Sequence, residues 1–262
     1  MTRWAIAMAV TLSAAGAAGA AVQTKTVDYE ADGTKLKGFL AYDDSAKGKG
    51  PAVLVFPEWW GLNDYAKNRA RQLAEMGYVA FAADLYGEGK VIDTAHPNDA
   101  MAMVTTLRQN QKAWRGRAEA ALKVLTSQPN VDPSKVAAIG YCFGGSTALQ
   151  LAYAGADLKA VATFHAALPA PTPDEAKAVK PKILVATGAD DSAIPPKAVE
   201  AFTGALEKAG KKPEVMSFPG VVHSFTVPEA DKVGNKNMKY DKAADQKSWQ
   251  AMKDLFKQTL GG

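Results

Sequence analysis

Residues 136–145 read VAAIGYCFGG, and this stretch decides the fold. The apolar run from Val136 to Ile139 predicts a short β-strand, and helix-forming sequence follows from Phe143 to Ala154. The turn between them has the pattern Gly-x-nucleophile-x-Gly, with Cys142 at its centre. The flanking glycines fit such a turn, because side chains there would collide with the neighbouring strand and helix. The pattern is therefore typical of a nucleophile held between a strand and a helix.

Strands and helices alternate on both sides of this turn. A β-hairpin is expected from Lys25 to Tyr42, with its turn at Asp32-Gly33. The other predicted strands cover residues 52–56, 78–84, 158–164, 183–186 and 213–218. The other predicted helices cover residues 63–76, 99–126 with a possible break near Gly116, 197–208 and 243–259, while 131–133 read as a turn and the prolines between 169 and 173 as a loop. This alternation predicts one three-layer α/β domain, with a mostly parallel sheet and an N-terminal antiparallel hairpin.

Composition excludes several classes of function. The chain has 262 residues, a formal net charge of +4 and acids and bases interspersed, which indicates an ordinary globular domain. The Lys-rich segments, such as Lys211-Lys212 and residues 232–242, are short and indicate a solvated face rather than a nucleic-acid interface. With one cysteine in the chain, neither an internal disulfide nor a soft-metal site is expected, and no motif indicates a metal or an organic cofactor.

The N-terminus has the layout of a secretory signal peptide. Arg3 provides a basic start, an apolar run extends from Trp4 to about Ala15, and Ala18-Gly19-Ala20 matches an Ala-x-Ala cleavage site. A membrane anchor is the alternative, but the apolar stretch is short for a bilayer and diluted by small residues. We expect residues 1–20 to be removed, which leaves the domain 21–262 as an exported, periplasmic protein. We expect this domain to act as a monomer without stable membrane association.

An acid and a histidine follow Cys142 in the order that a catalytic triad of this type requires. Asp191 comes after the strand that ends near residue 186, with Asp190 as a rival, and His223 comes after the strand that ends near residue 218. The chain has three histidines. His96 lies in a polar loop and is expected at the surface, and His165 precedes the acid in the chain, which is too early for this order but compatible with a place in the pocket.

The predicted roles follow from the chemistry. The Cys142 thiolate, favoured by the helix N-terminus, attacks an acyl carbon, and His223 moves the proton as base and then as acid. The aspartate orients the imidazole. The backbone N–H groups of Phe143 and Trp59 are expected to bind the oxyanion. Glu58 lies at the end of a buried strand beside two tryptophans, so burial should raise its pKa.

These motifs together resemble the dienelactone hydrolase family, over nearly the whole mature chain. The matching stretches are Pro57-Glu58-Trp59-Trp60-Gly61, Ala83-Asp84-Leu85-Tyr86-Gly87, Gly140 to Gly145, Gly188-Ala189-Asp190-Asp191 with Ile194-Pro195, and His223-Ser224-Phe225. The resemblance implies a compact α/β-hydrolase fold without a large lid and selects Asp191 over Asp190. It also implies that Glu58 hydrogen-bonds the resting thiol and takes up its proton. Residues expected to line the substrate pocket are Trp60, Tyr86, His165, Ser224 and Phe225.

The chain departs from the family pattern where a substrate carboxylate would bind. Family members that hydrolyse dienelactone carry two arginines, at positions where this chain has Gly87-Glu88-Gly89 and Thr226-Val227. Losing such partners costs a carboxylate about 2–5 kcal/mol of binding, so a different small ester or lactone is expected. Arg108 or Lys90 are candidates for a replacement charge. Two alternatives remain: an acyltransferase or thioesterase using the same triad, and a non-catalytic relative that binds a small molecule.

Overall fold

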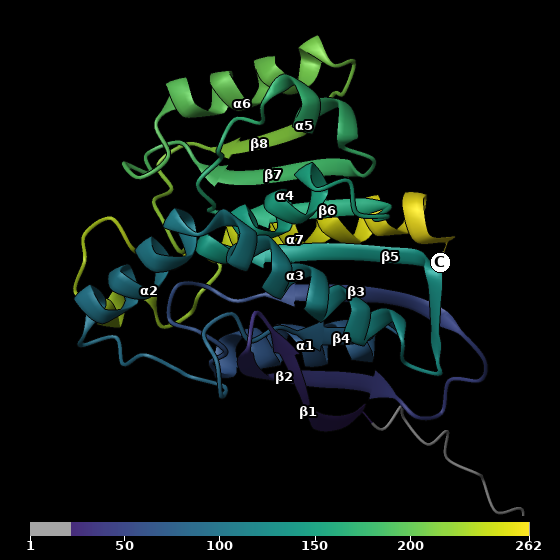
Figure 1. The fold of residues 1–262 in the computed structure, drawn as a ribbon. Helices are drawn as coiled ribbons and strands as arrows, with labels where there is room; N and C mark the ends of the chain where they lie inside the picture. The colour runs from purple at the N-terminus through teal and green to yellow at the C-terminus, as the bar shows by residue number, and fades with distance from the viewer. Residues whose placement is uncertain (1–21, 262) are drawn as a thin grey trace, which may run out of the picture.

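An eight-stranded sheet runs through the structure, a computed structural model that describes residues 22–261 (Figure 1). The strands lie in the order β1-β2-β4-β3-β5-β6-β7-β8. Their bounds are β1 Val22–Ala31, β2 Thr34–Asp43, β3 Gly50–Phe56, β4 Val79–Ala82, β5 Val131–Tyr141, β6 Ala160–Phe164, β7 Lys182–Gly188 and β8 Glu214–Phe218. The predicted signal peptide, residues 1–20, lies outside the described residues and stays a prediction. Within residues 22–261, none of the helices combines the length and the apolar character that a membrane crossing requires.

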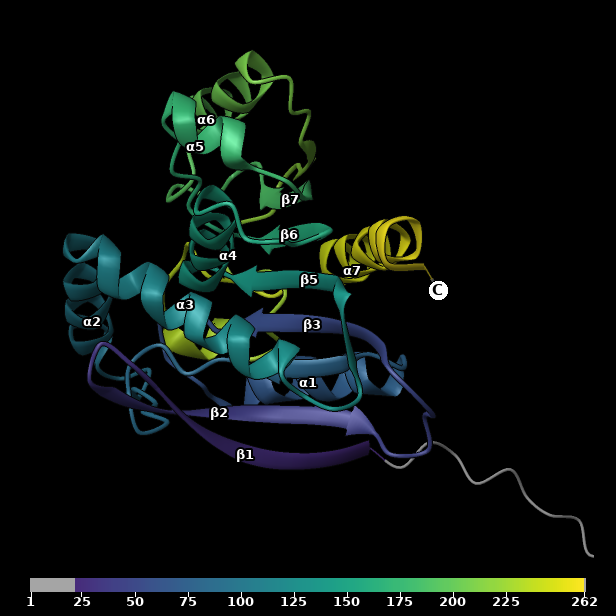
Figure 2. The same ribbon diagram turned by 45° about the vertical axis from the view of Figure 1, so that its right-hand side comes forward.

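The predicted hairpin and parallel sheet are confirmed. β1 pairs antiparallel with β2, β2 pairs antiparallel with β4, and the remaining strands from β4 to β8 are parallel. In Figure 2 the arrowheads of β3 and β5 point to the side of the molecule where α2 lies, and that of β2 points the opposite way. The carboxyl ends of the parallel strands therefore share one edge, where ligands of such sheets bind.

Helices cover both faces of the sheet. Residues of α1 (Asp64–Glu75) and α7 (Lys242–Phe256) pack in one core with alternate strand residues such as Val55 and Ile139. Residues of α3 (Gln111–Thr126), α4 (Phe143–Tyr153) and α6 (Pro196–Lys208) pack in a second core with Leu54 and Ala138. Neighbouring residues of the central strands enter opposite cores because side chains alternate across a sheet, and these strands are buried on both faces.

Three predictions of local structure were wrong. The stretch 131–133 is not a turn but the start of β5, where a register shift against Gly50 and Ala52 accommodates Pro133. The helix predicted over 99–126 is two helices, α2 (Pro97–Gln109) and α3, and it breaks at Asn110, whose side chain accepts a hydrogen bond from the Ala113 N–H, rather than at Gly116.

The proline-rich stretch after residue 169 contains a short helix that the sequence reading missed, α5 (Pro173–Ala178). Thr172 and Glu175 form a reciprocal capping box at its start, and Pro173 stands at its first turn. The prolines were read as breakers, whereas one of them begins a helix.

Candidate active site

Cys142 occupies a strained turn between β5 and α4. Its backbone has φ +50° and ψ −118°, in the left-handed half of the Ramachandran map where a non-glycine residue is uncommon. A Cβ atom at Gly140 would lie 2.1 Å from the Gly144 carbonyl oxygen, and one at Gly144 would lie 2.2 Å from the Phe56 carbonyl oxygen. Backbone atoms cannot yield at such distances, so the predicted steric reason for these glycines is confirmed. The turn leaves the Cys142 side chain partly exposed at the carboxyl edge of the sheet.

His223 and Asp191 come together beside this thiol. His223 Nδ1 lies 2.6 Å from Asp191 Oδ2, in the loops that follow β8 and β7. Burial alone would lower the pKa of His223, but the charge of Cys142 and the hydrogen bonds with Asp191 and Cys142 raise it well above its usual range. Asp190 instead accepts a hydrogen bond from the Gly220 N–H. The structure thus brings together Cys142, His223 and Asp191, and it holds Asp190 away from the histidine.

One further residue holds the aspartate in place. Asp191 Oδ1 accepts hydrogen bonds from Asn237 Nδ2 at 3.1 Å and from the Ala193 N–H at 2.9 Å. The side-chain oxygen of Asn237 accepts a hydrogen bond from the Ser192 N–H, and the backbone carbonyl oxygen of Asn237 accepts one from the His223 N–H. Asn237 therefore fixes the relative positions of the acid and the histidine. Sequence reasoning missed it because it lies in an irregular segment without a motif.

A cavity of about 270 Å³ opens on the thiol, and we refer to it as the Cys142 cavity. Both residues predicted to supply oxyanion donors, Phe143 and Trp59, line it together with His223. Phe143 begins α4, so its N–H has no intrahelical acceptor. The N–H of Trp59 makes no backbone hydrogen bond in the turns and loops of residues 22–261. Both donors are consequently available to an oxyanion beside Cys142.

One face of α2 forms another wall of the Cys142 cavity. Met101, Val104 and Arg108 line it at helical spacing, and the Arg108 guanidinium lies 5.8 Å from the centre of the Phe143 ring. Of the two candidates for a replacement charge, Arg108 lines this cavity and Lys90 does not. The cavity is therefore mostly apolar, with one guanidinium on the wall formed by α2.

Glu58 is buried on the other side of His223. Its Oε1 accepts a hydrogen bond of 2.9 Å from Ser224 Oγ, and only 2% of the residue is exposed. Burial raises its pKa, as predicted, against the opposing effects of the His223 charge and the Ser224 hydrogen bond. The hydrogen-bond partner of Glu58 is thus Ser224, whereas Cys142 lines the same cavity as His223. The resemblance implies a hydrogen bond between Glu58 and the resting thiol, and residues 22–261 do not show it.

None of the five residues predicted to line the substrate pocket lines the Cys142 cavity. Trp60 and Ser224 face a second cavity of about 690 Å³, which also contains Glu58 and Arg69 and which we call the Arg69 cavity. The remaining three, Tyr86, His165 and Phe225, line neither cavity. The Tyr86 hydroxyl donates to the Trp59 carbonyl oxygen at 2.8 Å, so it supports the loop of the oxyanion donor. His165 is fully buried behind His223, with the two ring centres 5.1 Å apart.

Residues 22–261 contain no group of three or more His, Cys, Asp or Glu side chains arranged to hold a metal ion. The chemistry that this arrangement supports is nucleophilic attack by a thiol, with a histidine to move the proton and two backbone donors for an oxyanion.

Comparisons with known proteins bear on the family and the fold. The model of the "Dienelactone hydrolase family" matches residues 36–260. A relative in Aquifex aeolicus, named "Putative carboxymethylenebutenolidase", is 29% identical over 238 residues, which cover 89% of this chain and 98% of the relative. A solved structure named m3DLH has a TM-score of 0.89 and 39% identity, covering 92% of this chain and 99% of its own.

A second solved structure is a dienelactone hydrolase-like promiscuous phosphotriesterase from metagenomic libraries. It has a TM-score of 0.89 and 40% identity, and the match covers 93% of this chain and all of the other. Because the family model extends over most of the sequence and the related structures share the whole fold, the chain belongs to the dienelactone hydrolase family and is a hydrolase of that type.

Proposed function

We propose that the protein hydrolyses small carboxylic esters or lactones through a covalent acyl-enzyme on Cys142. The observation that carries the proposal is the meeting of Cys142, His223 and two free backbone donors in one cavity, with Asp191 held 2.6 Å from His223. At about 270 Å³ the cavity suits a small acyl group better than a long one.

The reaction has two halves. His223 takes the proton of the Cys142 thiol, and the thiolate sulfur attacks the carbonyl carbon. A C–S bond forms, and the carbonyl electron pair moves to the oxygen, which the N–H groups of Phe143 and Trp59 stabilise. The intermediate then collapses, the ester C–O bond breaks, and the leaving oxygen takes the proton from His223. In the second half His223 removes a proton from water, the hydroxide attacks the thioester, and the acid is released as Cys142 recovers its proton.

Glu58 supports the charge on the histidine in this scheme. The ionised carboxylate and the His223 cation attract one another, which is why the charge of His223 lowers the pKa of the buried Glu58. By linkage the carboxylate favours the protonated histidine and so the thiolate that accompanies it. Its family role as acceptor of the thiol proton would require Glu58 to move from Ser224 towards Cys142 when substrate enters.

The test is turnover of p-nitrophenyl acetate by the wild type, Cys142→Ala and Cys142→Ser. We expect turnover by the wild type, none above background by the alanine variant, and a covalent acyl adduct on Cys142 in a rapid-quench mass spectrum. Equal rates for wild type and Cys142→Ala would refute the proposal. An acyltransferase would transfer the acetyl group to an added alcohol or thiol faster than to water. A thioesterase would hydrolyse an acyl thioester faster than the oxygen ester, and a binding relative would form no adduct.

A second candidate activity is cleavage of phosphotriesters by the same thiol. The observation that favours it is the promiscuous phosphotriesterase at 40% identity, whose fold matches with a TM-score of 0.89. The sulfur would attack phosphorus and expel an aryloxide, and the oxyanion donors would stabilise the added charge. Release of p-nitrophenol from a neutral diethyl p-nitrophenyl phosphate, lost in Cys142→Ala, would support this activity. No release would exclude it while leaving the ester reaction in place.

A further inference from the structure

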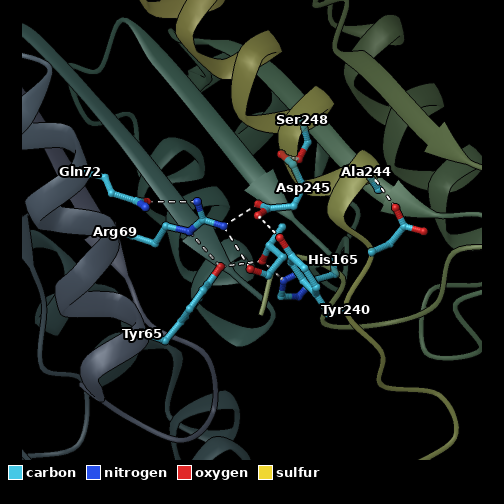
Figure 3. A network of polar contacts seen from close by, with 10 residues as sticks. Tyr65, Arg69, Gln72, His165, Tyr240, Ala244, Asp245 and Ser248 are labelled. Atoms are coloured by element: carbon cyan, nitrogen blue, oxygen red, sulfur yellow. Dashed lines mark hydrogen bonds and ion pairs between the residues drawn. The ribbon is translucent and has the colours of Figure 1, made fainter. Parts of the chain in front are cut away.

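A chain of hydrogen bonds leads from the wall of the Arg69 cavity to the buried His165. Arg69 Nε lies 3.2 Å from Tyr65 Oη, Tyr65 Oη lies 2.6 Å from Thr226 Oγ1, and Thr226 Oγ1 lies 2.8 Å from His165 Nε2. Figure 3 shows Arg69, Tyr65 and His165 joined in this network, with Asp245 on the far side of the guanidinium. The proposed mechanism uses none of these groups.

The chain has a defined direction. Arg69 Nε can only donate, so Tyr65 Oη accepts from it. Among residues 22–261, Thr226 Oγ1 is the one remaining hydrogen-bond partner of Tyr65 Oη, so we assign the Tyr65 hydrogen to this bond. Among residues 22–261, His165 Nε2 is likewise the one remaining hydrogen-bond partner of Thr226 Oγ1, so we assign the Thr226 hydrogen to this bond and His165 Nε2 as its acceptor. A neutral imidazole that accepts at one nitrogen carries its hydrogen on the other. The hydrogen of His165 is consequently placed on Nδ1.

Further contacts hold the Arg69 guanidinium in the orientation that donates to Tyr65. Arg69 Nη2 also donates to the Thr226 carbonyl oxygen at 3.1 Å and forms an ion pair with Asp245 at 2.5 Å. Its Nη1 donates to Gln72 Oε1. A guanidinium with these partners cannot turn its Nε away from Tyr65 without breaking an ion pair that is itself largely buried. The permanent charge of Arg69 thus polarises the whole chain towards His165.

His165 Nδ1 is the end of the chain and faces Glu58. It lies 3.9 Å from Glu58 Oε1, too far for a hydrogen bond, and it has no hydrogen-bond partner among residues 22–261. His165 and Glu58 are exposed by 0% and 2%, so little solvent separates them. A movement of about 1 Å by the carboxylate would bring the two atoms to an ordinary hydrogen-bond distance.

We propose that His165 is a positioning residue for Glu58, locked by Arg69, Tyr65 and Thr226 in the tautomer that presents Nδ1–H to the carboxylate. Together with the Ser224 hydroxyl, this N–H stabilises the ionised form of Glu58, the form that supports the His223 cation. The part of the proposal that concerns activity rests on the proposed hydrolysis. The tautomer itself does not.

The surroundings of His165 keep the ring neutral, as the proposal requires. Burial lowers its pKa well below the usual range, and the charges of His223 and Arg69 lower it further. The groups that face it come from every side: Glu58 from the loop after β3, His223 from the loop after β8, Arg69 and Tyr65 from α1, and the Tyr141 ring from β5. A hydrogen bond with the backbone of His165 itself opposes these effects and raises the pKa, but burial and the two positive charges outweigh it.

The first test reads the tautomer directly. With three histidines in the sequence, long-range ¹H–¹⁵N spectra of the ¹⁵N-labelled protein at neutral pH resolve each ring, and His96→Gln together with His165→Gln assigns them. We expect His165 to have a protonated Nδ1 and an unprotonated Nε2. A protonated Nε2, or a doubly protonated ring, would overturn the proposal whether or not the protein hydrolyses esters.

The second test reads the consequence for activity. In Thr226→Val the chain is cut, so Glu58 should ionise less readily and the acid limb of the kcat/KM profile should move to higher pH, on the order of half a pH unit for a dipole at this distance. Thr226→Ser should restore the wild-type profile. Thr163→Val is the matched control, because the Thr163 hydroxyl is equally buried and has no hydrogen-bond partner among residues 22–261.

A purely structural role for Thr226 would lower the melting temperature and leave the acid limb in place, and that result would overturn the proposal. If Thr226→Val does not fold, Tyr65→Phe cuts the same chain one link earlier and should move the limb in the same direction. If the wild type hydrolyses no ester, the proposed function fails, and the spectrum of His165 still decides the tautomer.

Discussion

Replacing Asp191 by asparagine is the most informative single change at this site, because the structure determines which way the new amide would face. Asp191 Oδ1 accepts from Asn237 Nδ2 and from the Ala193 N–H, and Oδ2 faces His223 Nδ1. In Asp191→Asn the carbonyl oxygen should keep the Oδ1 position, since an NH₂ group there would meet two donors. The NH₂ group is then turned towards His223 Nδ1.

The expected loss is large. An amide N–H directed at His223 Nδ1 forces that nitrogen to accept, which places the imidazole hydrogen on the nitrogen that should serve as base. A lost charge-assisted hydrogen bond costs about 2 kcal/mol, and the inverted tautomer costs at least as much again. Together they correspond to about 4 kcal/mol, or a loss in kcat/KM on the order of 10³-fold.

The assay is kcat/KM for p-nitrophenyl acetate, with circular dichroism to confirm folding. Asp190→Asn is the matched control, because Asp190 accepts a hydrogen bond from the Gly220 N–H, whereas the carboxylate that hydrogen-bonds His223 is that of Asp191. It should change kcat/KM by less than about twofold. If Asp191→Asn kept activity within about tenfold of the wild type, or if Asp190→Asn lost as much, the assignment of the acid would be refuted.

Three further changes test other parts of the molecule. Gly144→Ala should lower the free energy of unfolding by more than about 3 kcal/mol in urea melts, because the added Cβ would lie 2.2 Å from a backbone oxygen. Gly204→Ala in α6 is the control: no atom lies within 4 Å of an added Cβ there, and the free energy of unfolding should rise by about 0.5–1 kcal/mol. Equal effects would contradict the steric argument. Arg108→Met should lower kcat/KM about tenfold or more for an ester that carries a carboxylate and much less for a neutral ester of the same size, and equal losses would exclude charge recognition by this guanidinium. The lowered pKa of His165 means that the unfolded chain binds a proton below about pH 6.5 that the folded protein does not bind, so this residue makes the protein less stable as pH falls, by up to about 1.4 kcal/mol per pH unit. Between pH 7 and pH 5 the wild type should therefore lose more unfolding free energy than His165→Gln does. If the difference in unfolding free energy between the two proteins stayed constant, His165 would titrate normally.

The residues of the proposed triad were accessible to sequence reasoning because each follows a strand directly. Gly140 and Gly144 mark the turn of Cys142, and the chain order of the nucleophile, acid and histidine restricts the choice to Asp190 or Asp191 and to His223. The parallel sheet then brings these strand ends to one edge, so an argument based on topology is enough to place them together.

The lining of the pocket was not accessible in the same way. Trp59 lines the Cys142 cavity and Trp60 lines the Arg69 cavity, and likewise His223 lines the first and Ser224 the second. Consecutive residues in these tight loops point in opposite directions, so membership of a motif does not place a side chain in the pocket. The positions depend on loop torsions, such as the φ of +54° at Ser224, which no local sequence signal indicates.

Contacts between segments far apart in the chain were also beyond sequence reasoning. Arg69 and Asp245 are 176 residues apart, and Tyr65 and Thr226 are 161 residues apart. Neither pair belongs to a motif, and each arises from the packing of α1 against the loop after β8 and the start of α7. The break between α2 and α3 was misplaced for a related reason, since Asn110 acts as a cap through one hydrogen bond, while Gly116 inside α3 lies where an added Cβ would be 3.3 Å from Asp32 Oδ2.

The placement of α2 has a consequence for how new specificities can arise in this scaffold. Met101, Val104 and Arg108 reach the Cys142 cavity from one helical face, whereas the nucleophile, acid and histidine all follow strands of the sheet. Asn110 separates this helix from α3, so its sequence can vary without changing the register of the core helix that follows. Under the proposed function, substrate choice and bond cleavage therefore reside on segments that can diverge independently. A combinatorial library confined to residues 101 and 108, which are exposed, should yield altered substrate ranges at little cost in folding, whereas Val104 also packs in the core.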